Sequence, residues 1–206
     1  MKIGIREAVR MRQGVLNIVF ALLWSRFAYV YAAAFLTNPA LVTALFFVLE
    51  TIIVVAFCIR RPALIQSNQW RDWVPACGAI VFGMLFQPSR ETQDLVIGYI
   101  LEIVGICVAM LGMFSLGRSF AILPANRGLQ TGGLYACIRH PVYAGYMLLY
   151  TGYTVLNPLG ANVVVLLFCV GMLFWRAANE EQLLARDPSW LTYAKRVRWR
   201  ILPYVY

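Results

Sequence analysis

Residues 94–116 read DLVIGYILEIVGICVAMLGMFSL, an apolar stretch whose only charged residues are Asp94 at its start and Glu102 in its interior. A helix rises about 1.5 Å per residue, so a stretch of this length crosses the hydrocarbon core of a bilayer, which is about 30 Å thick. Lipid offers no water to backbone groups, and the short alternating strands of a closed barrel are absent. The stretch is therefore predicted to be a transmembrane helix.

Five further apolar segments accompany it. They cover about residues 15–36, 40–60, 73–87, 141–156 and 160–176, and the last two form a hairpin around a turn at 157–160. The chain is 61% hydrophobic and 13% charged, whereas soluble domains are about 25% charged. The predicted fold is an all-α integral membrane protein with about six transmembrane helices.

The basic residues predict its orientation. If both termini are cytoplasmic, 16 of the 18 Lys and Arg lie on that side, with Arg90 outside and Arg26 within a span. Such asymmetry follows the positive-inside rule. It predicts a multi-pass membrane protein, in the cytoplasmic or inner membrane if bacterial, with the loop 117–140 and the tail 176–206 cytoplasmic. The net charge of +9 then needs no nucleic-acid partner, and none is expected. The first apolar stretch is too long for a signal-peptide core of roughly 7–15 residues, and is interpreted as a retained span.

Two charged residues of the first hairpin lie at the same depth. Arg26 and Glu50 are each 12 residues from Asn38 in the first turn, which places both about 18 Å from it. A charge at that depth is costly unless paired, so an ion pair across this hairpin is predicted. Glu102 has no obvious partner. The five cysteines form no C-x-x-C pair and the chain has one histidine, so no metal site is expected.

The loop 117–140 runs into PVYAGY at 141–146, and His140, the only histidine, stands immediately before Pro141. Proline suits the first turn of a helix, whose free N–H groups and dipole favour an anion. Together with the side chains of Arg139 and His140, this helix start predicts an anion site. Nearby glycines would let the backbone turn closely around a ligand; they are Gly128, Gly132 and Gly133.

A simpler reading remains open for this loop. It could be a basic, glycine-rich connection that ends a membrane helix, with Tyr143 and Tyr146 as interface aromatics. The glycines do not form G-x-G-x-x-G and no strand precedes them, so a dinucleotide fold is excluded.

A second polar segment, FWRAANEEQLLARDPSWLTYAKRVRWRILP, covers residues 174–203. Arg176 and Glu180 are four apart and share one helix face, whereas Glu181 points elsewhere. The alternative is an exposed helix end with a simple Arg–Glu pair. Asp187 and Pro188 predict the start of a short amphipathic helix on the membrane surface. The hairpin brings both polar segments to one surface, which predicts a pocket for a zwitterionic ligand, open to water above and to lipid beside.

Three motifs carry a resemblance to a known family. LGRSF at 116–120, GGLYACIRHPVY at 132–143 and RAANEEQLL at 176–184 resemble the isoprenylcysteine carboxyl methyltransferase family, within a wider group of membrane methyltransferases that includes phospholipid N-methyltransferases. The resemblance covers about residues 94–206 and departs at Leu134, where many members have proline. It implies two parts: three N-terminal spans at 1–90, and a methyltransferase core of three spans, loop and tail at 91–206.

The resemblance implies S-adenosylmethionine as the cofactor, bound between the membrane helices and the C-terminal segment. The implied cofactor contacts are Arg127, Gly128, Leu129, Gln130, Tyr135, His140, Pro141, Val142, Tyr143 and Glu180. His140 and the helix N-terminus suit the cofactor's carboxylate, the tyrosines its sulfonium or adenine, and Glu180 its ribose hydroxyls or amino group.

Two residues are expected to act on the acceptor. The resemblance links Arg176 to the substrate, and a carboxylate acceptor would need orientation by this arginine but no general base. A thiol or amine would need deprotonation, for which Glu181 is the candidate.

The expected function is S-adenosylmethionine-dependent methyl transfer to a lipophilic or lipidated acceptor that enters from the bilayer. Carboxyl O-methylation of an isoprenylcysteine-like group is the first choice. Phospholipid amine N-methylation and small-thiol S-methylation are alternatives within the enzyme class. A non-catalytic membrane protein or transporter that keeps the loop is the alternative of a different class.

Overall fold

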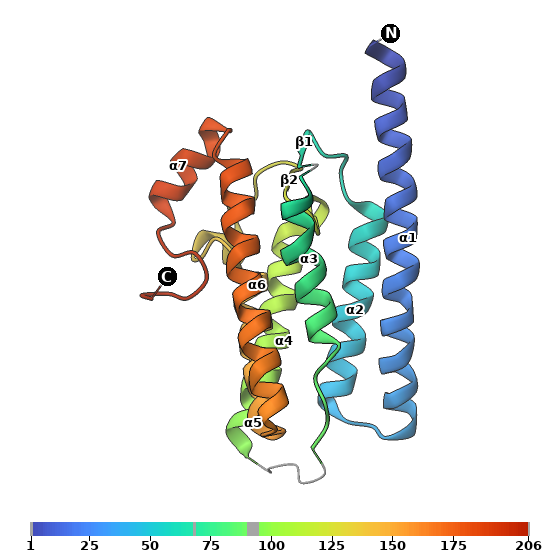
Figure 1. Ribbon diagram of the computed structural model, residues 1–206, viewed down its shortest axis with the longest axis vertical. Helices are drawn as coiled ribbons and strands as arrows, with labels where there is room; N and C mark the ends of the chain where they lie inside the picture. Colours follow the sequence, from blue (N-terminus) through green and yellow to red (C-terminus); the bar gives the residue numbers. More distant parts are fainter. Residues whose placement is uncertain (1, 68, 90–94, 206) are drawn as a thin grey trace.

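The computed structural model describes residues 2–67, 69–89 and 95–205, with side chains from residue 11 onward except residue 12. The described chain is mostly helical (Figure 1). Its helices are α1 (Lys2–Thr37), α2 (Leu41–Ile59), α3 (Trp70–Gly83), α4 (Val96–Leu116), α5 (Pro141–Leu156), α6 (Gly160–Leu184) and α7 (Pro188–Arg196). Two 3-10 turns, Gly117–Ser119 and Gly133–Ala136, and two short strands, β1 (Ile65–Gln66) and β2 (Ala125–Asn126), complete it.

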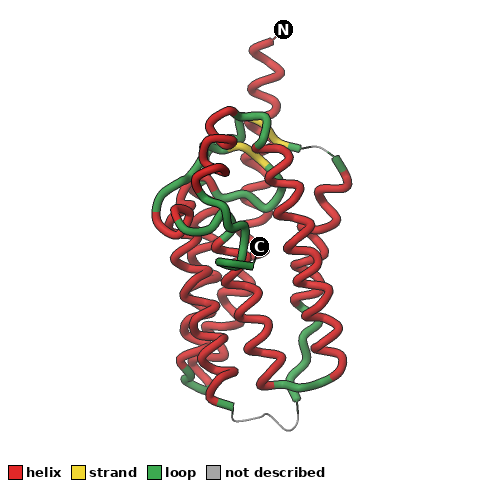
Figure 2. Tube along the Cα trace, turned by 90° about the vertical axis from the view of Figure 1, so that its left-hand side faces the viewer, coloured by secondary structure: helices red, strands yellow, loops and turns green. Residues whose placement is uncertain are grey.

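All six apolar segments form helices, which confirms the all-α membrane fold. The third helix ends at Gly83, earlier than expected, and α6 continues past residue 176 to Leu184. Within the described residues, four helical stretches are long and apolar enough to cross a membrane: Gln13–Thr37, Leu41–Ile59, Val96–Ser119 and Gly160–Leu184. The helices α3 and α5 are shorter but run alongside the others in the bundle (Figures 1 and 2). A count of six complete spans stays a prediction.

Glycines bring α4 and α5 into very close contact. A Cβ added to Gly105 of α4 would overlap the backbone N of Leu149 and lie 2.7 Å from the carbonyl oxygen of Gly145 on α5. A Cβ added to Gly145 would lie 2.5 Å from the backbone N of Ala109. Small residues let membrane helices approach backbone to backbone in this way. This contact fixes α5, whose first turns carry the site, against α4.

The loop 117–140, the β-strands and α7 lie at one end of the bundle, near the start of α1 (Figures 1 and 2). Strand β1, between α2 and α3, pairs antiparallel with β2 of the loop, with Ile65 opposite Asn126. The predicted gathering of loop and tail at one end is therefore seen. Which membrane face this end occupies stays a prediction, and Arg90, expected on the opposite face, lies outside the described residues.

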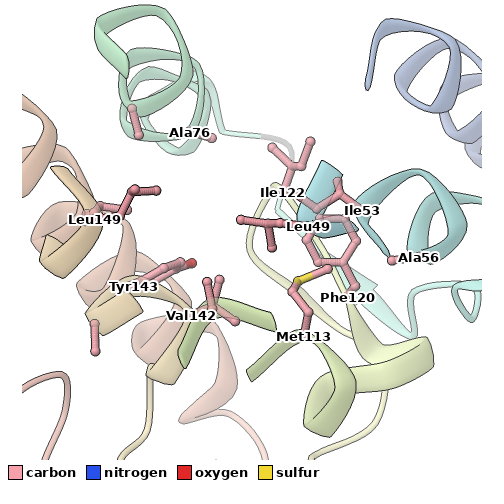
Figure 3. Close-up of a cluster of buried hydrophobic side chains, with 14 of the residues drawn as sticks. Leu49, Ile53, Ala56, Ala76, Met113, Phe120, Ile122, Val142, Tyr143 and Leu149 are labelled. Atoms are coloured by element: carbon pink, nitrogen blue, oxygen red, sulfur yellow. The ribbon is translucent and has the colours of Figure 1, made fainter. Parts of the chain in front are cut away.

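The core at this end joins the early helices to the later ones. Figure 3 shows apolar side chains of α2, α4, α5 and the loop converging, among them Leu49, Met113, Phe120 and Val142. Leu49 and nearby Phe57 have no exposed surface. The two predicted parts, 1–90 and 91–206, thus share one core, although the boundary between them stays a prediction.

The predicted ion pair between Arg26 and Glu50 is wrong. Arg26 is exposed and Glu50 partly buried, and no ion pair joins them among the described residues. The face of α1 that meets α2 carries aromatic side chains, with Phe20 and Trp24 packed on Phe57 at ring distances of 5.4 Å. Residue 26 is rotated by about 200° from residue 24 on a helix. Equal depth therefore did not place the two charges on facing surfaces.

Candidate functional site

A cavity of about 980 Å³ runs inside the bundle and is bordered by residues of all seven helices and of the loop 117–140. This volume lies at the upper end of the range of roughly 300–1,000 Å³ for small-molecule sites. Of the predicted site residues, all border the cavity except Pro141 and Glu181. The structure thus brings the loop and the start of α5 together with the end of α6, about 40 residues further along the sequence.

The start of α5 is built as predicted, with Pro141 as the first helical residue and His140 as the N-cap. The tail returns alongside it: the backbone N–H of His140 donates to the carbonyl of Arg200 at 2.8 Å, and that of Arg139 to the carbonyl of Trp199 at 3.0 Å. Sequence spacing gave no sign of this pairing, because the tail after α7 has no regular structure. It fixes the N-cap from outside the bundle.

The His140 ring lies between two carboxylates. Its Nε2 is 3.2 Å from Glu181 Oε1, its Nδ1 is 3.8 Å from Glu180 Oε2, and its ring stacks on Tyr143 with centroids 5.2 Å apart. An ionised carboxylate only accepts hydrogen bonds, so Nε2 presents its hydrogen to Glu181. Only Nδ1 is left for a ligand, and that atom faces Glu180. Its predicted contact with a cofactor carboxylate stays a prediction.

Glu180 is the centre of a network on the cavity wall. The hydroxyl of Tyr143 donates to its Oε1 in a short hydrogen bond, and Arg176 Nε donates to the same oxygen at 3.2 Å. Arg176 Nη2 also donates to the carbonyl of Ala121 at 3.0 Å, and its guanidinium lies 5.2 Å from the centre of the Tyr143 ring. The predicted i, i+4 pair is therefore present, and it faces the cavity rather than solvent.

Glu181 faces the opposite way, as its rotation on the helix predicted. Its carboxylate pairs with Arg139 Nη1 and with Arg200 Nε, each at 3.1 Å. Arg139 also donates to the carbonyls of Ala194 and Val197, both at 2.8 Å, at the C-terminal end of α7. These contacts tie α6, α7 and the tail to the start of α5. The predicted catalytic role of Glu181 stays a prediction, and Arg139 acts here as an anchor inside the protein.

The loop has four glycines, and three of them have a positive φ that favours glycine: Gly117 at +51°, Gly128 at +101° and Gly133 at +57°. Gly132 has an ordinary negative φ. Asn126 holds the turn at Gly128: its Oδ1 accepts from the N–H of Gly128 at 3.0 Å, and its Nδ2 donates to Asp187 Oδ2 at 3.1 Å. The loop is therefore linked to the start of α7.

Arg127 is a buried cation with an unpaired donor. Its side chain is 5% exposed and borders the cavity. One N–H donates to the carbonyl of Arg61, while Nε is buried with no hydrogen-bond partner among the described residues. Burial lowers the pKa of Arg127 from its usual value. An unsatisfied buried donor is costly, so an anionic group beside it would be stabilised.

Helix α7 closes this end of the cavity. Asp187 caps it, accepting from the Ser189 N–H at 3.0 Å, and Trp190 and Tyr193 border the cavity. The Tyr193 hydroxyl donates to the carbonyl of Tyr135 at 2.8 Å, and burial raises the pKa of Tyr193 to about 12. The amphipathic helix is confirmed. Its expected contact with lipid is corrected, because these apolar residues pack on Leu129 and Leu184 of the protein.

Several residues of the cavity were missed from sequence. Trp190 and Tyr193 could have been found, because they are three residues apart and so share one face of the short helix α7. Two large aromatic residues on one face indicate that this face packs against another part of the protein. Glu50 was assigned to an ion pair, Glu102 was left without a role, and both border the cavity.

Comparison with known proteins finds a family and a relative to which this chain is similar. Residues 94–187 match the sequence profile of the phospholipid methyltransferase family, one of the families in the group of membrane methyltransferases that resemble isoprenylcysteine carboxyl methyltransferase. The resemblance drawn from the motifs is confirmed. The chain is also similar to Delta(14)-sterol reductase of Mus musculus, with 33% identity over 85 residues, which is 39% of this chain and 20% of that protein. The match thus spans about a fifth of the curated relative.

Proposed function

We propose that this membrane protein transfers a methyl group from S-adenosylmethionine to a lipophilic acceptor that reaches the cavity from the bilayer. The observation that carries the proposal is the position of Glu180, which the Tyr143 hydroxyl and Arg176 hold on the wall of a large cavity. This wall lies within the segment that matches the phospholipid methyltransferase family. The cavity also extends into the bundle, where a bilayer-derived acceptor would lie.

The residues present fit this cofactor, which supplies an activated methyl group on a sulfonium and is zwitterionic at its methionine end. Arg127, with its unpaired buried Nε, suits the carboxylate. Glu180 accepts hydrogen bonds and suits the amino group or the ribose hydroxyls. The aromatic rings of Tyr143, Trp190 and Tyr193 border the same space and suit the sulfonium or the adenine. The cap formed by α7 keeps water from the reacting groups, and the exclusion of water favours an in-line displacement.

Arg176 connects the cofactor end of the cavity to the acceptor. The motifs led us to expect carboxyl O-methylation of an isoprenylcysteine-like group, and Arg176 could orient such a carboxylate. The name of the matched family favours the alternative, a phospholipid amine. In either case the role proposed for Arg176 and Glu180 is to align the two reactants, which is the main requirement of methyl transfer.

Cofactor binding by the purified protein in detergent tests the proposal. We expect S-adenosylhomocysteine to bind, and Glu180→Ala to weaken binding by about 10- to 100-fold, since hydrogen bonds to charged groups contribute about 1.5–3 kcal/mol. Asp72→Ala is the matched control, because Asp72 carries a carboxylate on α3 outside the cavity lining.

Three outcomes would contradict the proposal. These are no binding of S-adenosylhomocysteine, binding unchanged by Glu180→Ala, or selective binding of a reduced nicotinamide nucleotide, a hydride donor that would indicate a reductase. Transfer of a radiolabelled methyl group to a lipid extract, followed by base treatment, then separates esters from amines.

A further inference from the structure

The membrane-embedded half of the cavity contains two carboxyl groups that the proposed function does not use. Glu50 of α2 and Glu102 of α4 both border the cavity. Glu102 is only 4% exposed, and neither residue has a hydrogen bond or ion pair in the part of the chain that the structure describes. Ionisable groups inside a membrane protein are costly, and unpaired ones indicate a ligand.

Both groups lie deep in the bundle, Glu50 midway along α2 and Glu102 in the half of α4 away from the loop. Glu50 is nine residues from Leu41 at the start of α2, and Glu102 six residues from Val96 at the start of α4. At about 1.5 Å per residue, they lie about 14 Å and 9 Å inside these candidate spans. Gly152 of α5 lies against Glu102, since a Cβ added to it would be 2.9 Å from Glu102 Cγ. The two carboxyls therefore come from different helices that face one cavity.

Tyrosines lie near both carboxyls. Tyr31 stacks on Phe46, which is one turn before Glu50 on α2, with ring centroids 4.6 Å apart. Tyr150 and Tyr153 flank Gly152, the residue of α5 that lies against Glu102. Together with Tyr146, these three tyrosines border the cavity. On α5 they continue the face of Tyr143, so one line of aromatic rings leads from the Glu180 network to the two carboxyls.

The charges of the cavity are separated along its length. Its arginines, Arg127, Arg139 and Arg176, belong to the loop, the start of α5 and the end of α6. No lysine or arginine of the described residues borders the half around Glu50 and Glu102. A carboxylate would be repelled in that half. A positively charged head group would gain from two nearby carboxyls and from the faces of the tyrosine rings.

We propose that Glu50, Glu102 and the four surrounding tyrosines form a subsite that binds the ammonium head group of an amphiphilic acceptor. Its connection with methyl transfer rests on the proposed function, whereas binding itself does not. The subsite draws Glu50 and Tyr31 from α2 and α1, outside the segment 94–187 that matches the family. It selects an amine over a carboxylate, contrary to the acceptor first expected from the motifs.

Three probes that share an eight-carbon alkyl chain and differ in the head group test the subsite: octylamine, octanol and octanoate. The full chain in a neutral detergent is titrated by calorimetry at pH 7. We expect the Kd of octylamine to be at least about 10-fold lower than that of octanol. Octanoate should bind more weakly than octanol. This comparison needs no variant, so a failure to fold cannot obscure it. Equal binding of the three probes, or preference for octanoate, would overturn the proposal.

Variants then assign the preference to the two residues. The double variant Glu50→Gln/Glu102→Gln keeps the side-chain shapes and replaces both carboxyls by amides that cannot ionise, and the affinity for octylamine should fall to that for octanol. Asp72→Asn, outside the cavity lining, is the control and should keep the preference. Retention of the amine preference in the double variant would refute the assignment. If wild-type protein prefers octylamine but never binds S-adenosylhomocysteine, the subsite stands and the proposed function fails.

Discussion

Gly105→Ala should destabilise the protein, because the α4–α5 contact leaves no room for a methyl group. The added Cβ would lie 2.7 Å from the carbonyl oxygen of Gly145 and 2.9 Å from the Cα of Leu149. These neighbours are backbone atoms, so no side-chain rotation relieves the overlap and the two helices must move apart. Overpacking of this kind costs about 1–3 kcal/mol. A chain of this size then loses roughly 2–12 °C in melting temperature.

The assay is thermal unfolding of the purified protein in one detergent, followed by circular dichroism. Gly171→Ala is the matched control, since a Cβ at Gly171 in the middle of α6 meets nothing within 4 Å. Its melting temperature should stay the same or rise, because alanine is the better helix former. A melting temperature of Gly105→Ala equal to that of Gly171→Ala would refute the close approach of α4 and α5.

Two further predictions concern the tail that closes the cavity. Hydrogen bonds from Ser189 and Asn126 hold the pKa of Asp187 below its usual value, so its contribution is present above about pH 4 and is lost as the pH falls through the lower folded-state pKa. The protection of α7 amides against hydrogen exchange, measured relative to the intrinsic exchange rate at each pH, should therefore fall as the pH is lowered from about 5 to about 2 in wild type but not in Asp187→Asn. Equal pH profiles of protection would contradict this role. Arg139→Gln and Glu181→Gln should each lower the free energy of unfolding by about 3–5 kcal/mol, the cost of breaking a buried ion pair. The double variant should lose less than the sum of the two single losses, as measured by chemical denaturation. Additive losses would exclude the pairing.

The elements of this fold were predictable because each leaves a local signal. Long apolar runs gave the helices, Pro141 gave the start of α5, and Asp187 with Pro188 gave the start of α7. The hairpin of α5 and α6 then placed Glu180 near His140 without any knowledge of packing. Side chains whose position follows from helix ends and short turns were thus located correctly.

Rotation about the helix axes was not predictable by the same reasoning. In a membrane helix both the lipid-facing and the buried surfaces are apolar, so periodicity indicates poorly which side faces the protein. Arg26 and Glu50 were paired on depth alone, and the structure turns Arg26 outward. The glycines Gly98, Gly105 and Gly112, seven apart on α4, did carry a signal of close packing, but their partner helix was not evident from sequence.

The pairing of β1 with β2 illustrates a different limit. Two-residue strands have no periodicity of their own, and Ile65 and Asn126 are 61 positions apart. Their contact holds the loop against the α2–α3 connection, which positions Arg127 beside the carbonyl of Arg61. The burial of Arg127 therefore depends on a long-range contact, although its presence at the site followed from the motif.

The two ends of the cavity divide the work of the protein between different parts of the chain. The segment that matches the family supplies Glu180, Tyr143 and Arg176 at one end, and α1 and α2 supply Tyr31 and Glu50 at the other. In-line methyl transfer requires the reacting atoms of the two bound molecules to be in contact, so under the proposed function the cofactor and the acceptor meet along the tyrosine-lined stretch of α5 that joins these ends. Substitution of Glu50 should consequently change which acceptor binds while leaving the cofactor contacts in place, because Glu50 lies on α2 and makes no hydrogen bond or ion pair with Glu180, Tyr143 or Arg176.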